Sequence, residues 1–128
     1  MKFNFFKYES NEALNTLAQL FGAGGNTWGE DTAGAAAGAT ATKAAQSERT
    51  YKILWATFYT DADSLLQIKD GSTIVWEGHL DVDVQGTTLH VTFPGGLDGT
   101  KGNAVSALIA ASSADCRVTF GGVYFDEV

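Results

Sequence analysis

Residues 51–60 form a run, YKILWATFYT, in which β-branched and aromatic residues dominate and neither glycine nor proline occurs. This composition predicts a β-strand. Strict alternation divides the run into two faces, Ile53, Trp55, Thr57 and Tyr59 on one side and Lys52, Leu54, Ala56 and Phe58 on the other. Neither face is consistently polar. The pattern therefore predicts a strand covered on both sides, either central in a sandwich or at a subunit interface.

The chain after this run repeats short strand-like segments separated by turn residues. The dipeptide Asp70-Gly71 is a strong hairpin signal between two such segments. Further strands are predicted at residues 65–69, 73–80, 87–93, 103–111 and 116–125. Six or more strands at short, regular spacing predict an antiparallel sandwich or barrel.

Small residues mark the irregular parts of the predicted β-body. Residues 94–102 are dense in turn-forming residues and predict an exposed loop. Gly121 and Gly122 predict a bulge in the last strand. Residues 32–45 consist almost entirely of Ala, Gly and Thr, whose small side chains allow close backbone approach. They are predicted to form an extended segment laid along a sheet or along another subunit.

The N-terminal part of the chain has a different pattern and predicts an arm. Ser10 is the expected N-cap of an amphipathic helix whose apolar residues recur at helical spacing until Gly22. A helix of about three turns is marginal alone in water, so it should dock on its own body or on a partner. The glycine-rich residues 22–29 predict a flexible hinge. The predicted domains are an arm over residues 1–30 and a β-sandwich body over residues 31–128.

The arm also begins with an apolar segment, because residues 2–8 contain three Phe and one Tyr. Such an end must be covered, and a short strand or an anchor on a partner would cover it equally well. The residues expected to contact a partner are the apolar ones of the arm, namely Phe3, Phe5, Phe6, Tyr8, Leu14, Leu17, Phe21 and Trp28.

Composition narrows the class of protein. A hydrophobic share of 45% and an aromatic share of 12% in 128 residues suffice for one compact domain with an appendage. The net charge of −7 disfavours nucleic acid and anionic membranes as partners, because both require clustered Lys and Arg. No run approaches the ~20 apolar residues of a membrane span, and the first residues are too polar for a signal peptide. The chain is expected to be kept in a cytoplasm or assembled there into something larger.

Candidate chemistry is sparse. The single cysteine, Cys116, lies in a strand-like run and is expected to be a buried small hydrophobe and not a nucleophile. His79, Asp81 and Asp83 would share one face of a strand and could bind a metal, but solvent-facing alternation explains the same pattern. No catalytic residue, cofactor or metal site is therefore predicted.

The three tryptophans, Trp28, Trp55 and Trp76, allow two interpretations. They could form a platform on which sugar rings stack. Packing in the core or at an interface is the commoner role of Trp in strands.

Several segments occur in a recognisable order. An Ala/Gly/Thr-rich opening is followed by RTYKILWA at 49–56, LQIKDG at 66–71, GGL at 95–97, KGNAVSAL at 101–108 and VTFGGVYFDEV at 118–128. In this order the body resembles the small jelly-roll proteins that decorate the heads of tailed bacteriophages. The resemblance implies an all-β, antiparallel, jelly-roll-like β-sandwich that binds the major capsid protein as a homotrimer. Residues 1–30 do not match that pattern.

The leading hypothesis is thus a non-enzymatic virion protein that decorates and cements the outer surface of a capsid, after assembly in the host cytoplasm and without a cofactor. Contacts in the core or the trimer are expected from four aromatic residues, Trp55, Tyr59, Trp76 and Tyr124. The alternative is a β-sandwich ligand-binding module, such as the carbohydrate-binding head of a viral fibre, that uses exposed Trp. A small β-barrel enzyme is a third and weaker possibility.

Overall fold

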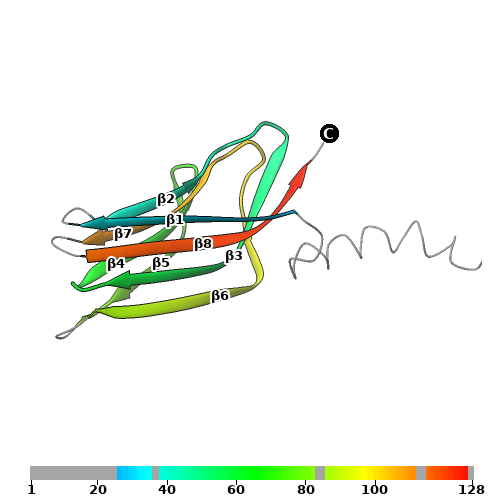
Figure 1. The fold of residues 1–128 in the computed structure, drawn as a ribbon. Helices are drawn as coiled ribbons and strands as arrows, with labels where there is room; N and C mark the ends of the chain where they lie inside the picture. The colour runs from blue at the N-terminus through cyan, green and yellow to red at the C-terminus, as the bar shows by residue number, and fades with distance from the viewer. Residues whose placement is uncertain (1–25, 36–37, 83–85, 112–114, 127–128) are drawn as a thin grey trace, which may run out of the picture.

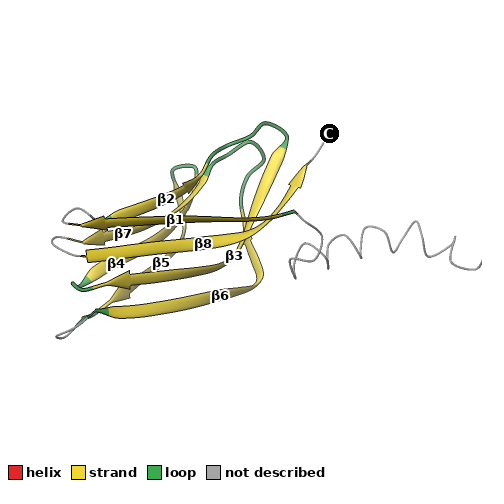
Figure 2. Cartoon of the chain, viewed as in Figure 1, coloured by secondary structure: helices red, strands yellow, loops and turns green. Residues whose placement is uncertain are grey.

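The computed structural model describes residues 26–35, 38–82, 86–111 and 115–126, which form an all-β structure (Figures 1 and 2). The strands in these ranges are β1 (Thr27–Ala35), β2 (Ala39–Lys43), β3 (Arg49–Thr60), β4 (Ser64–Asp70), β5 (Thr73–Leu80), β6 (Thr87–Asp98), β7 (Val105–Ala111) and β8 (Asp115–Asp126). The predicted arm helix lies outside the described residues, as do the predicted contact residues Phe3, Phe5, Phe6, Tyr8, Leu14, Leu17 and Phe21.

Two four-stranded antiparallel sheets face each other, one in the order β1-β8-β3-β6 and the other in the order β2-β7-β4-β5 (Figure 1). Except for the β4–β5 hairpin, each strand is followed by one in the opposite sheet. This strand order is that of a jelly roll, and it confirms the predicted fold class. The hairpin at Asp70-Gly71 is also confirmed, with Gly71 at a positive φ of 60°.

The core lies between the sheets. The largest side chains with almost no exposed surface are Tyr51, Phe58 and Phe120 from the first sheet, and Leu66, Ile68 and Ile109 from the second. Burying one such aliphatic or phenylalanine side chain stabilises a protein by about 1.5–3 kcal/mol. Cys116 is buried in the same cluster, which confirms its prediction as a small core residue.

The central strand β3 is confirmed, but its predicted faces are wrong. The register with both β8 and β6 shifts between Ile53 and Trp55. Before the shift Ile53 is buried, and after it Ala56 and Phe58 are buried. A single extra residue changes the parity of alternation, so Trp55 and the residues at 57 and 59 lie on the opposite face from Ile53.

The bulge predicted at Gly121 and Gly122 of β8 lies instead in the neighbouring strand β3. Gly121 and Gly122 of β8 lie directly opposite the extra residue of β3, paired with Trp55 and Ile53. A Cβ at Gly122 would collide with the Lys52 carbonyl oxygen, and one at Gly121 would lie 2.7 Å from the Trp55 ring. The glycines therefore accommodate the bulge.

The predicted loop at residues 94–102 is wrong in its first half. β6 continues to Asp98, and Leu97 and Asp98 pair with Ile53 and Lys52 of β3. Pro94 is tolerated because β6 is an edge strand. Gly95 and Gly96, with φ values of 80° and 81°, provide the backbone turn that lets the strand resume its pairing.

The predicted hinge is wrong at residues 27–29, because β1 begins at Thr27 and pairs there with β8. The boundary drawn at residue 30 thus falls inside a strand. The extended segment predicted at residues 32–45 contributes the end of β1 and all of β2, which belong to different sheets. A glycine-rich composition favours flexibility locally, but here Gly29 of β1 pairs with Gly121 of β8.

Candidate functional site

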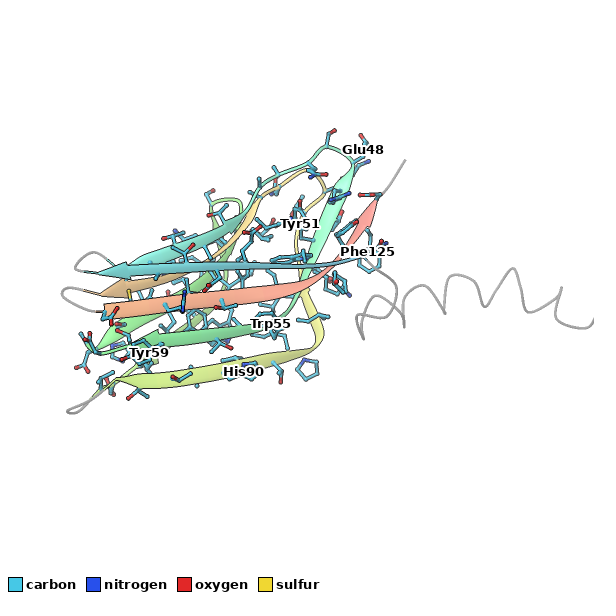
Figure 3. The ribbon with its side chains drawn as sticks, in the orientation of Figure 1. Glu48, Tyr51, Trp55, Tyr59, His90 and Phe125 are labelled. Carbon is cyan, nitrogen blue, oxygen red and sulfur yellow. The ribbon has the colours of Figure 1, made fainter. Side chains whose placement is uncertain are left out.

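On the outer surface of the sheet β1-β8-β3-β6, paired residues form rows that cross all four strands in register. The first row is Gly29, Gly121, Trp55 and Thr92, the second is Asp31, Thr119, Thr57 and His90, and the third is Ala33, Arg117, Tyr59 and Thr88. We call these residues the aromatic–polar face. Figure 3 shows its labelled members Trp55, Tyr59 and His90 along β3 and β6.

Hydrogen bonds fix the middle row of the aromatic–polar face. Thr57 Oγ1 and His90 Nδ1 share a hydrogen bond of 2.6 Å, and Thr119 Oγ1 donates to Asp31 Oδ1 at 2.8 Å. Arg117 Nε, from the third row, lies 3.2 Å from the same carboxylate oxygen. These contacts restrict the side-chain rotamers before any ligand arrives, which reduces the entropy lost on binding.

Two aromatic rings flank this polar row, and each is next to a glycine. The Trp55 indole stacks on His90 with ring centroids 6.4 Å apart and an interplanar angle of 27°, and it occupies the space that a Cβ of Gly121 would need. The Tyr59 ring likewise occupies the place of a Cβ at Gly86. Both aromatic side chains are half-buried, so each retains surface for a ligand.

The chemistry of the aromatic–polar face combines flat π surfaces with hydroxyl, imidazole, carboxylate and guanidinium groups. A sugar ring has an apolar face of C–H groups surrounded by a rim of hydroxyls. An aromatic ring can cover the first, while fixed polar side chains exchange hydrogen bonds with the second. This face is therefore suited to a flat, polyhydroxylated ligand.

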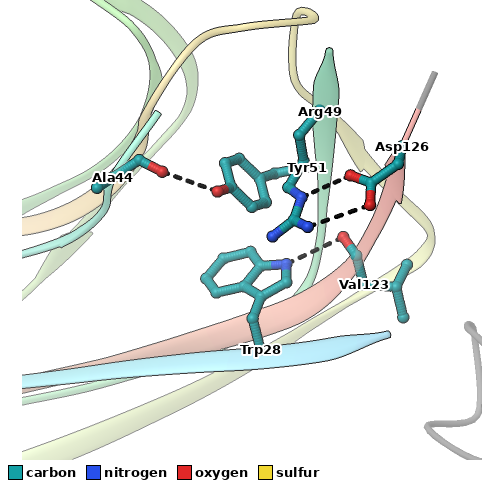
Figure 4. Close-up of polar contacts among 6 residues, drawn as sticks. All are labelled: Trp28, Ala44, Arg49, Tyr51, Val123 and Asp126. Atoms are coloured by element: carbon teal, nitrogen blue, oxygen red, sulfur yellow. Dashed lines mark hydrogen bonds and ion pairs between the residues drawn. The ribbon is translucent and has the colours of Figure 1, made fainter. Parts of the chain in front are cut away.

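A second aromatic and polar cluster closes the end of the sandwich where β1, β3 and β8 meet (Figure 4). Trp28 Nε1 donates to the Val123 carbonyl at 2.9 Å, and the Tyr51 hydroxyl donates to the Ala44 carbonyl at 2.7 Å. The side chains of Trp28 and Tyr51 are both buried. These bonds satisfy the polar atoms of buried rings, which gives this cluster a structural role.

The same end is held by Arg49, which donates two hydrogen bonds to Asp126, at 2.7 and 3.1 Å (Figure 4). The guanidinium carbon also lies 3.7 Å from the centroid of the Tyr124 ring. The hydrogen bond from Arg49 lowers the pKa of the Asp126 carboxyl, and the same bond raises the pKa of Arg49. Tyr124, predicted as a core or trimer residue, packs against the core beneath this ion pair.

The three tryptophans do not form one platform. Trp28, predicted to contact a partner, is buried with 8% of its surface exposed and packs within its own sandwich. Trp76 of β5 packs inward against Phe58 and Phe93, with ring centroids 5.7 and 5.8 Å apart. Only Trp55, among the three, lies on the aromatic–polar face. Strict alternation along the sequence predicts that Trp55 shares the face of Ile53. The bulge reverses this, and the sequence alone does not reveal the bulge in β3.

The remaining candidates have structural explanations. His79 Nδ1 lies 3.0 Å from Asp81 Oδ1, while Asp83 is outside the described residues. Among the residues that the structure describes, no group of three His, Cys, Asp or Glu could hold a metal ion. Burial raises the pKa of the Cys116 thiol, and its Sγ donates to the Gly34 carbonyl at 3.4 Å. A protonated, buried thiol is a poor nucleophile.

One side of the sandwich is only partly closed, where the edge strands β5 and β6 lie beside each other. Neither strand contains a fully buried residue. Apolar residues from both reach the core while remaining half-exposed, namely Val75, Trp76, Leu80, Leu89, Phe93 and Leu97. We call these residues the β5–β6 edge. Beside it, Ile74 of β5 is 48% exposed.

The strand order and the aromatic–polar face together define a jelly-roll β-sandwich with a surface suited to ligand binding. No described helix is long and apolar enough to cross a membrane. No protein-family model matches the sequence, and a comparison with curated proteins found no match.

Solved structures with a similar fold include carbohydrate-binding modules. One is the module CBM36 in complex with calcium and xylotriose, with 10% identity over 73% of this chain and 78% of that chain, at a TM-score of 0.37. Another is the family 11 module from Clostridium thermocellum in complex with a β-1,3-1,4-mixed-linked tetrasaccharide, with 10% identity, 80% and 89% coverage and a TM-score of 0.30.

A phage protein is also similar. It is the enzymatically active domain of tailspike protein 4 of bacteriophage CBA120, with 12% identity over 77% of this chain but 19% of that chain, at a TM-score of 0.34. At such low identities and TM-scores, these similarities assign neither a family nor a ligand to this chain. The function is therefore argued from its own surface.

Proposed function

We propose that this protein is a non-enzymatic β-sandwich binding protein that binds carbohydrate on the aromatic–polar face. The observation that carries the proposal is the arrangement around Trp55, an outward indole that lies beside the hydrogen-bonded row of Asp31, Thr119, Thr57 and His90. Stacking supplies affinity, and the fixed polar groups supply orientation.

Charge indicates which carbohydrates are favoured. The face holds the carboxylate of Asp31 and the guanidinium of Arg117 as an ion pair, so these two charges offset each other locally. The whole chain has a net charge of −7, which repels polyanions. Neutral glycans are therefore the expected ligands, in preference to sulfated or uronic acid polymers.

Replacing the central ring tests this proposal. Trp55→Ala is expected to weaken glycan binding about five- to tenfold, since one stacking contact of roughly 1–1.5 kcal/mol is removed. Binding would be screened on a neutral glycan array and quantified by titration calorimetry. Leu65→Ala is the matched control, because Leu65 is 36% exposed on β4 of the other sheet. Equal binding by the wild type and Trp55→Ala would exclude this face.

A second candidate function is decoration of a phage capsid as a homotrimer, which the sequence resemblance implies. The β5–β6 edge favours it. At this edge, apolar side chains are half-exposed, and β5 and β6 each have one side without a neighbouring strand. A neighbouring subunit could cover both features. A trimer would also bind a capsid lattice multivalently, so modest contacts per subunit would give high occupancy.

If this candidate function is correct, light scattering should give the mass of a trimer, and the trimer should depend on contacts at the β5–β6 edge. Ile74→Asp, at an exposed position of β5, should dissociate the trimer into folded monomers, because an unpaired charge would be buried at the interface. Leu65→Asp, on the same outer surface as Ile74 but on β4, one strand further from the edge, should leave the mass unchanged. A monomeric wild type, or an Ile74→Asp protein that remains trimeric, would count against assembly through this edge.

A further inference from the structure

The geometry points to an oligosaccharide that runs along β3, with one sugar unit on Trp55, another on Tyr59 and at least one unit between them. This inference rests on the proposed carbohydrate-binding function and adds the size and orientation of the ligand. It assigns two aromatic subsites and a polar middle subsite to the aromatic–polar face.

The spacing of the two rings sets the minimum length of the ligand. Trp55 and Tyr59 are four residues apart on one side of β3, which corresponds to about 13 Å at roughly 3.3 Å per residue. The register between them is regular, because the shift lies before Trp55. This distance exceeds the width of one sugar ring, so a monosaccharide cannot contact both aromatic side chains.

The row between the two rings provides the polar contacts for the middle unit. Thr57 lies midway between Trp55 and Tyr59 on β3, with His90 on one side and Thr119 on the other. In the hydrogen bonds already formed, His90 uses one ring nitrogen and Asp31 uses one carboxylate oxygen. Each group therefore has a second polar atom with which it can bond a sugar hydroxyl.

The direction along β3 is favoured over the direction across the strands. Within a row, each aromatic ring stands alone, since Trp55 is flanked by Gly121 and Thr92, and Tyr59 by Arg117 and Thr88. A glycan lying across the sheet would meet only one ring. A glycan lying along β3 meets both.

A glycine leaves room for each of the two rings. A Cβ at Gly121 would approach the Trp55 ring to 2.7 Å, and a Cβ at Gly86 would overlap the Tyr59 ring. Each ring thus fills a space that only glycine leaves open. The two subsites are preformed, so little ordering is required when the ligand binds.

The test is a chain-length series with the full-length protein. Calorimetry would use cello-oligosaccharides and xylo-oligosaccharides of one to four units, together with any neutral series found on the array. For the series that binds, affinity is expected to rise at least about tenfold from the monosaccharide to the trisaccharide and then to level off.

Variants assign this gain to its subsite. Tyr59→Ala should remove most of the gain in affinity on adding the third unit, while Tyr59→Phe, which keeps the ring, should retain most of that gain. Trp55→Ala should weaken all members of the series. Equal affinity for one and three units, or a Tyr59→Ala protein with the wild-type length dependence, would overturn this inference and leave carbohydrate binding intact. Absence of binding to every glycan on the array would overturn the proposed function, and this inference with it.

Discussion

Trp28→Ala is expected to lower the free energy of unfolding by about 3–5 kcal/mol, the usual cost of removing a large buried ring. Trp28 packs edge-on against Phe120 and Tyr51, with ring centroids 4.9 and 5.6 Å apart. Its Nε1 donates to the Val123 carbonyl, so the substitution also removes a hydrogen bond between β1 and β8. The loss should appear as a lower midpoint in urea denaturation.

Two other variants separate these contributions. Thr27→Ala, at the neighbouring exposed position, should change stability by less than about 0.5 kcal/mol. The destabilisation caused by Trp28→Phe should lie between those of Trp28→Ala and Thr27→Ala, because Phe keeps an aromatic ring but has no hydrogen-bond donor. If Trp28→Ala were no more destabilising than Thr27→Ala, β1 would not be an integral strand of the sandwich. Residues 27–30 would then belong to an arm, as the sequence alone suggested.

Gly122→Ala is expected to destabilise the protein by about 3 kcal/mol or more, at the upper end of the cost of overpacking. A methyl group at this position would collide with the Lys52 carbonyl oxygen and lie 3.0 Å from the Leu54 nitrogen. Both atoms belong to the β3 backbone at the bulge and cannot rotate away. The strands β3 and β8 would have to separate in the middle of the sheet.

Gly29→Ala is the matched control for this substitution. It adds the same methyl group in the same sheet, but on β1, where the nearest atom would be the Phe120 carbonyl oxygen at 3.8 Å. Its stability should therefore remain within about 0.5 kcal/mol of the wild type. A Gly122→Ala protein as stable as Gly29→Ala would show that β3 and β8 do not approach so closely at the bulge.

The bulge connects this stability experiment to the proposed binding function. Trp55 faces outward because one extra residue in β3 reverses the alternation after Ile53. Gly122 and Gly121 accommodate that extra residue, and Gly121 also leaves room for the indole. We therefore expect that changes which distort the bulge also displace the central ring of the aromatic–polar face.

The two proposed functions use different surfaces. The aromatic–polar face consists of outward side chains of the first sheet, whereas the β5–β6 edge consists of inward-facing apolar side chains at one side of the sandwich. A trimer assembled through that edge would leave the outer face of each subunit exposed. Carbohydrate binding and capsid decoration are therefore compatible in one protein.

Local sequence was sufficient to predict the β class, a strand at β3, the β4–β5 hairpin and the burial of Cys116. These features follow from local chemistry. β-branched and aromatic runs favour strands, Asp-Gly favours a tight turn, and a small apolar residue in a strand is usually buried. Each of these features can be predicted from residues that are close together in the sequence.

The residues of the aromatic–polar face are brought together only by tertiary contacts. Asp31, Thr119, Thr57 and His90 come from four strands, and they meet because β1 pairs with β8, β8 with β3 and β3 with β6. Trp55 points outward because a bulge shifts the register, and Trp28 is buried because it belongs to β1, which pairs with β8. Register and long-range pairing arise from contacts between residues distant in sequence, so local patterns do not encode them.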